Sequence, residues 1–128
     1  MSIKKKLLII TDGTELIDSI AHSLKTALKS TVKISRADVF DGTDLLASDT
    51  FFIGCEKPNP SSFKYLEEML EHINLVERHC GIFSANKKTL KYLSGILKGC
   101  DAKVGEPLLI TEPDAKAVNN WLKGLWNN

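Results

Sequence analysis

A short polar turn directly after the first apolar run of the chain contains residue types that could bind an anion. Leu7 to Ile10 is followed by Thr11-Asp12-Gly13-Thr14. Hydroxyl groups, and the backbone N–H groups of a glycine-containing turn at a helix N-terminus, can enclose a phosphate. Asp12 opposes such binding, because its charge lies close to where a dianion would sit and the turn contains no cation. We therefore favour the alternative, in which Thr11 or Asp12 caps the following helix.

Cys55 is a second residue that could do chemistry, because it closes a strongly apolar run. A thiol at the carboxyl end of a central strand could act as a nucleophile or a redox sensor. Lys57 is the one obvious cation near it, and the adjacent Glu56 disfavours a thiolate. We favour the alternative that Cys55 is a small buried apolar residue.

The remaining histidines, cysteines and carboxylates show no spacing that is typical of a metal site or a catalytic triad. A cluster of glutamates reads as the solvated face of a helix. These histidines and cysteines are His22, His72, His79, Cys80 and Cys100, and the glutamate cluster is Glu67, Glu68 and Glu71. We therefore predict no catalytic residues and no metal-binding residues, and we expect a binding module or electron carrier rather than an enzyme.

The composition limits the classes of partner and compartment. A chain of 128 residues with 43% hydrophobic residues is long enough for one domain, residues 1–128, with one core. Seventeen basic residues balance sixteen acidic ones, so the net charge of +1 favours neither nucleic acid nor membrane as a partner. The three scattered cysteines indicate a reducing compartment, and no apolar stretch is long enough to span a bilayer. These features predict a cytoplasmic protein.

Hydrophobic periodicity predicts alternating strands and helices, which indicates a parallel sheet with helices on both faces. We expect Ser61 or Ser62 to cap the helix after the third strand, Gly99 to end the helix after the fourth strand, and Thr111 to cap the last helix. Trp121 fits the core face of that last helix, whereas Trp126 marks either an interface or a frayed end. The expected strands are 6–10, 32–36, 50–55, 81–83 and 102–110. A helix is expected after the first, third, fourth and fifth of these strands, and a single helical turn is expected within 38–49.

Several scaffold segments resemble those of short-chain flavodoxins. The segments are Asp44-Leu45-Leu46, Phe51-Phe52-Ile53-Gly54-Cys55, Gly81-Ile82-Phe83-Ser84 and the run from Asp101 to Ile110 with its Gly-x-Pro. The resemblance covers nearly the whole chain. It implies an α/β, flavodoxin-like three-layer sandwich whose five-stranded parallel sheet has the order 2-1-3-4-5. The fifth strand, 102–110, shows no interruption in the sequence, which indicates the short-chain kind. The resemblance also implies a crevice beside the first and third strands, where the family binds FMN.

The resemblance assigns cofactor binding to three loops, and each loop departs from the family pattern. The first is two or three residues shorter than the family's phosphate cradle. The other two lack the aromatic residues and glycines against which a flavin packs. Lys57, Lys87 and Lys88 give the rim a basic character, whereas flavodoxins are generally acidic there. The implied binding residues are Thr11, Asp12, Gly13, Thr14, Cys55, Glu56, Lys57, Ser84, Ala85 and Asn86.

Three functions are compatible with these residues. The one we favour is a flavodoxin-like domain with weakened or lost FMN binding that acts as an interaction or regulatory module for a redox or regulatory protein. The second is a divergent FMN-binding flavodoxin that carries one electron at a time. The third is an enzyme that uses Cys55 or an unrecognised pocket.

Overall fold

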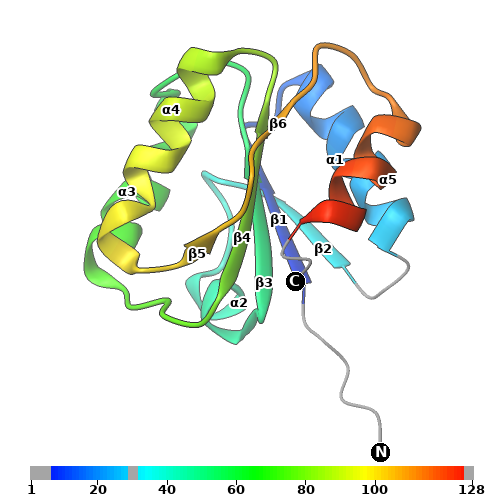
Figure 1. The fold of residues 1–128 in the computed structure, drawn as a ribbon. Coiled ribbons are helices and arrows are strands. Elements are labelled where there is room, and N and C mark those ends of the chain that lie inside the picture. The colour runs from blue at the N-terminus through cyan, green and yellow to red at the C-terminus, as the bar shows by residue number, and fades with distance from the viewer. Residues whose placement is uncertain (1–6, 29–31, 126–128) are drawn as a thin grey trace, which may run out of the picture.

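The computed structural model describes residues 7–28 and 32–125. Helices α1 and α5 cover one face of a central sheet, while α3 and α4 cover the other (Figure 1). The elements are β1 (Leu7–Thr11), α1 (Glu15–Leu28), β2 (Val32–Arg36), α2 (Gly42–Ala47), β3 (Thr50–Gly54), a 3₁₀ turn (Ser61–Phe63), α3 (Lys64–His72), β4 (His79–Ser84), α4 (Lys87–Ile96), a second 3₁₀ turn (Lys98–Cys100), β5 (Lys103–Val104), β6 (Leu108–Leu109) and α5 (Ala115–Gly124).

The sheet is parallel throughout its described strands and has the order β2-β1-β3-β4-β5, with β6 also pairing with β4. This confirms the predicted order and fold class. Every residue of β1 and β3 is buried, as a central parallel strand covered on both faces requires. Alternate residues therefore enter two separate cores. Leu8 and Phe51 pack toward α3 and α4, whereas Ile9 and Phe52 pack toward α1 and α5.

Two glycine–phenylalanine pairs hold β3 against β4. The register places Phe52 opposite Gly81 and Gly54 opposite Phe83. A Cβ atom added to Gly81 would lie 2.6 Å from Phe52 Cδ2, and one added to Gly54 would lie 2.3 Å from Phe83 Cε2. Each ring thus lies across the glycine opposite it, which the sequence run Gly81-Ile82-Phe83 does not reveal by itself.

The fifth strand is broken in two, so the prediction of one uninterrupted strand over 102–110 is wrong. β5 pairs with the start of β4 and β6 with its end, and Gly105, Glu106 and Pro107 separate them. Proline has no N–H to donate to a ladder. The carbonyl of Glu106 accepts a hydrogen bond from Trp121 Nε1 at 2.8 Å, so α5 takes the place of a strand partner at the break.

Two of the predicted helix N-caps are wrong. The residues Ser61 and Ser62 form a 3₁₀ turn with Phe63, and α3 begins after this turn without a side-chain cap. Asp114, rather than Thr111, caps α5, because its carboxylate accepts from the backbone N–H groups of the second and third helical residues. In both places the chain turns before the helix starts, and periodicity alone does not locate that turn.

The predicted C-cap at Gly99 is also wrong. Gly99 lies inside the 3₁₀ turn, and Asp101 takes the left-handed conformation with φ of 61°. Aspartate is one of the few non-glycine residues that tolerate this conformation. Lys6 and Trp126 lie outside the described residues. In the part of the chain that the structure describes, no helix is both long and apolar enough to cross a membrane.

Two glycine-to-alanine substitutions should have opposite effects on the free energy of unfolding. Gly95→Ala should stabilise the protein by about 0.5–1 kcal/mol, because Gly95 is in a helix and an added Cβ meets no atom within 4 Å. Gly81→Ala should destabilise it by about 1–3 kcal/mol through the clash with Phe52. Urea denaturation measures both; equal effects would contradict the glycine–phenylalanine packing.

Candidate functional site

The three predicted loops gather at the carboxyl edge of the sheet, because β1, β3 and β4 are adjacent and parallel. Two hydrogen bonds join them through Glu56. Its backbone N–H donates to Asp12 Oδ2 at 2.8 Å, and its carbonyl accepts from Asn86 Nδ2 at 2.9 Å. The structure therefore brings the residues of the loops together as the resemblance implied, with one residue of the second loop bridging the other two.

The Asp12 carboxylate accepts from two donors of the predicted phosphate cradle. Oδ1 accepts from the Thr14 backbone N–H at 3.0 Å and from Thr14 Oγ1 at 2.7 Å. Oδ2 accepts from the Glu56 N–H, so one side chain engages three donors on two loops. We call this arrangement the Asp12 bridge. A carboxylate of the protein itself therefore uses donors that an anionic ligand would need.

Thr11 is fully buried and its hydroxyl is engaged within its own turn and helix. Thr11 Oγ1 donates to Asp18 Oδ1 at 2.8 Å and accepts from the Gly13 N–H at 3.3 Å. The amides that Thr11 and Asp12 accept from belong to Gly13 and Thr14, which precede the first residue of α1. Both side chains thus hold the turn into the helix rather than capping the helical amides.

Arg36 is a residue of this site that the sequence analysis missed. It ends β2 and pairs in register with Thr11 at the end of β1. Gly13 has φ of 81°, and a Cβ atom added to it would lie 2.8 Å from Arg36 Nε. The first loop therefore has a cation beside it, which also forms an ion pair with Asp38 at 3.1 Å. The signal in the sequence was the position of Arg36 at the end of a strand expected next to β1.

Cys55 lies under the second loop as a buried thiol. Burial, and secondarily the nearby Asp12 carboxylate, raise the pKa of Cys55 to about 12. Its carbonyl accepts from Ser84 Oγ at 2.7 Å, which ties the ends of β3 and β4 together. The arrangement agrees with a structural cysteine and gives no means of forming a thiolate at neutral pH.

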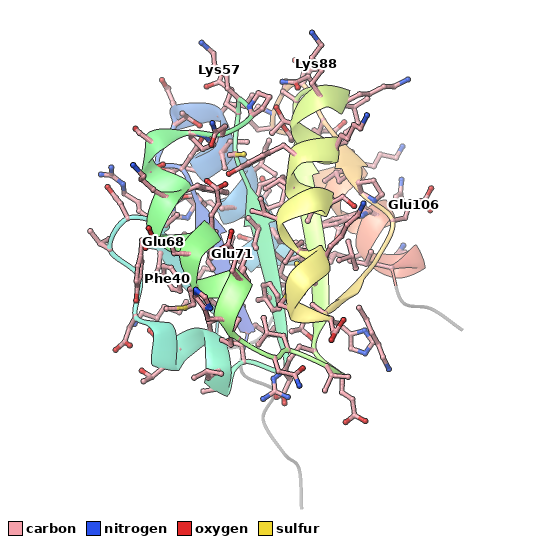
Figure 2. All side chains as sticks on the ribbon, turned by 90° about the vertical axis from the view of Figure 1, so that its left-hand side faces the viewer. Phe40, Lys57, Glu68, Glu71, Lys88 and Glu106 are labelled. Carbon is pink, nitrogen blue, oxygen red and sulfur yellow. The ribbon has the colours of Figure 1, made fainter. Side chains whose placement is uncertain are left out.

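The third loop contains the N-cap residue of α4. Asn86 Oδ1 caps the helix by accepting from the Thr89 N–H at 2.8 Å. Because the Asn86 amide also donates to Glu56, and Ser84 donates to Cys55, both polar side chains of this loop have partners within the protein. Ala85 lies between them and is half-buried. Lys57 and Lys88 extend outward at this end of the molecule (Figure 2).

These loops do not fit the isoalloxazine ring of FMN. The loops after β3 and β4 contain no aromatic residue. Phe63, the first aromatic residue after the second loop, is fully buried and packs near Tyr92 with ring centroids 6.4 Å apart. Tyr65 packs instead against Phe40, with centroids 5.3 Å apart. The site thus offers neither free phosphate donors at Asp12 nor a flat aromatic surface for a flavin.

Comparison with known proteins identifies the fold. No protein-family model and no curated protein matches the sequence. Among solved structures, oxidised flavodoxin 2 from Bacillus cereus is 21% identical with a TM-score of 0.79, over 91% of this chain and 94% of that one. A short-chain flavodoxin associated with a bacterial microcompartment is 17% identical with a TM-score of 0.75, over 96% and 97% of the two chains.

A third similar structure holds the cofactor. It is a mutant Fusobacterium nucleatum flavodoxin bound to flavin mononucleotide, 12% identical with a TM-score of 0.73 over 94% of each chain. The chain described here therefore has the flavodoxin-like fold. At these identities the likeness concerns the fold, and the function has to be argued from the loops.

Removing the Asp12 bridge should lower stability. Asp12→Ala leaves the Thr14 and Glu56 amides without their acceptor, and we expect a loss of about 1–3 kcal/mol in urea denaturation. Asp12→Asn keeps an acceptor oxygen and should lose less. Faster hydrogen exchange at the Glu56 amide should accompany the alanine variant. Unchanged exchange there would contradict the bridge.

The Cys55 thiol should react slowly. With its pKa raised to about 12, Cys55 is protonated at neutral pH, so an alkylating reagent should label it more slowly than a free thiol in a peptide. Because an unfolded thiol ionises near 9.0, stability should fall as the pH rises from 9.0 toward about 12. Mass spectrometry of labelled peptides measures the rate, and labelling as fast as in the denatured protein would contradict this burial.

Proposed function

We propose that this chain is a flavodoxin-fold interaction module with weak or no FMN binding. The observation that carries this proposal is the Asp12 bridge, in which the protein's own carboxylate accepts the three donors of Thr14 and Glu56. A carboxylate held in this way acts as an internal substitute for a bound anion. It joins the loops after β1 and β3 without a cofactor.

The energies support this interpretation. A phosphate could take the donors of Thr14 and Glu56 only if Asp12 were displaced, and the Asp12 carboxylate would then lose three charge-assisted hydrogen bonds, each worth about 1.5–3 kcal/mol. A phosphate placed beside Asp12 would be repelled by about 4 kcal/mol per unit charge at 4 Å and intermediate dielectric. Arg36 offsets little of this, because its side chain is 57% exposed and already paired with Asp38, and such surface pairs contribute about 0–1 kcal/mol.

The partner we propose is another protein with a redox or regulatory role in the cytoplasm. The exposed lysines at the loop edge, Lys57, Lys87 and Lys88, support a partner with acidic groups. Electrostatic complementarity mainly accelerates association and selects the partner, so a basic edge selects against the basic partners that acidic flavodoxins attract.

A second candidate is a divergent FMN-binding electron carrier. Two observations favour it: a similar structure holds flavin mononucleotide, and Arg36 lies beside Gly13 as a phosphate-binding cation would. In that function Thr14, Gly13 and Arg36 would hold the phosphate, and FMN would supply one-electron chemistry. The Asp12 bridge would then have to open.

Titration with FMN distinguishes the two functions. The wild-type protein should leave flavin fluorescence unquenched at high micromolar protein. Asp12→Asn removes the opposing charge and should bind FMN at least about tenfold more tightly, which corresponds to about 1.4 kcal/mol. The matched control is Asp49→Asn, which makes the same change directly before β3, at the opposite edge of the sheet from the three loops. This variant should bind FMN no better than the wild type. Sub-micromolar binding by the wild type, or a yellow purified protein, would overturn the proposal and favour the carrier.

A further inference from the structure

A groove on the α3/α4 face of the molecule lies between α4 and the broken edge strand. It encloses about 520 Å³, and Ile82, Leu90, Val104 and Pro107 supply its apolar surface. None of the ten residues of the three loops contributes to it. In Figure 1, α4 and β5 lie on the same side of the molecule, away from α1 and α5. The groove is thus a surface distinct from the flavodoxin-type crevice.

The edge of the sheet beside this groove has backbone groups that could pair with an added strand. The N–H groups of Lys103 and Gly105 donate to β4, at the carbonyls of Arg78 (2.8 Å) and Cys80 (3.0 Å). Because N–H and C=O groups alternate in direction along a strand, those of Val104 point to the opposite, outer side. β5 ends the order of the described strands, so an added strand could pair with Val104.

The wall formed by α4 is basic. Lys91 and Lys98 line the groove, and Lys87 lies one turn before Lys91 on the same helical face. Lysine occupies three of the ten residues of α4, and the helix has no acidic residue. Lys103 adds an exposed cation on β5. Within the described residues that line the groove, no carboxylate opposes these charges.

Small residues leave the groove open. Ser94 and Gly95 face it from α4, and Gly105 faces it from the break in the strand. A Cβ atom added to Gly95 would have no neighbour within 4 Å, so there is room for the side chains of a partner. An apolar floor, a basic wall and an unpaired backbone edge therefore occur together.

We propose that this groove binds an extended acidic segment of a partner protein, which adds a strand beside β5. Its apolar side chains would enter the groove over Leu90 and Val104, and its carboxylates would face Lys91 and Lys98. This mode combines backbone pairing with pockets for alternate side chains. A nucleic acid would satisfy the lysines but leave the apolar floor without a partner. The inference rests on the proposed interaction function and names its surface and the chemistry of its partner.

Titration of the full-length, ¹⁵N-labelled protein with a peptide of alternating valine and glutamate tests the proposal. The amide signals of Lys91, Gly95, Val104 and Gly105 should shift, and affinity should fall as salt is raised. Peptides of alternating valine and lysine, or serine and glutamate, should bind at least about tenfold more weakly. No shifts, or shifts confined to the three loops, would overturn the proposal.

Three variants make the test specific. The double variant Lys91→Glu and Lys98→Glu should lose at least about tenfold in affinity, whereas Lys25→Glu with Lys123→Glu, on the α1/α5 face, should not. Val104→Pro removes the outward N–H but none of the β4 hydrogen bonds, and should also weaken binding. Equal loss of affinity in both double variants would overturn the proposal. Concentration-dependent dimerisation that the Lys91 and Lys98 changes abolish would also overturn it, because the groove would then bind a second copy of this chain.

The outcome is separable from that of the FMN titration. Sub-micromolar FMN binding by the wild type would defeat the proposed function whatever the peptide does. Absence of both FMN and peptide binding would defeat only the groove assignment and leave the Asp12 bridge in place.

Discussion

The central strands are covered on both faces, and this constraint determines where polar groups can be placed. β1 and β3 are buried along their whole length, so their side chains have no contact with solvent until the strands end. Polar side chains then appear together at the carboxyl edge, in the turn after β1 and in the loops after β3 and β4. The glycine–phenylalanine pairs Phe52–Gly81 and Gly54–Phe83 fix β3 against β4, and thereby fix the loops that follow these strands.

At this edge the protein satisfies its own hydrogen-bond donors. A turn after the first strand of a parallel sheet exposes N–H groups that require acceptors, and a ligand phosphate is one solution. Asp12 is another, and it has the further effect of joining the loops after β1 and β3. Ser84 and Asn86 connect the loop after β4 to the same segment. Because these donors are paired within the protein, the loops do not need a ligand as acceptor at these positions, and this is the physical basis for separating fold from function in this chain.

The break in the fifth strand is a second consequence of local chemistry. Pro107 cannot donate to the ladder, and Trp121 of α5 takes the carbonyl of Glu106. The break leaves β5 as a two-residue edge with the backbone groups of Val104 turned outward. A short edge limits indiscriminate pairing between sheets, while the lysines of α4 add a charge requirement for any strand that approaches. The same features are the ones on which the proposed binding of an acidic strand depends.

The sequence by itself determined the α/β fold class and the buried character of the thiol, because continuous apolar runs and their alternation with amphipathic helices depend only on local pattern. The order of the strands followed from the resemblance to flavodoxins and not from that pattern. The sequence also identified Asp12 as the residue that opposes an anion. It misplaced the caps at Ser61, Ser62, Gly99 and Thr111, since turns of a few residues shift where a helix starts or ends without changing its periodicity. Only the tertiary structure decided that Asp12 bridges to Glu56, 44 residues away, and that Arg36 lies over Gly13. Such contacts are set by strand register and loop closure in three dimensions.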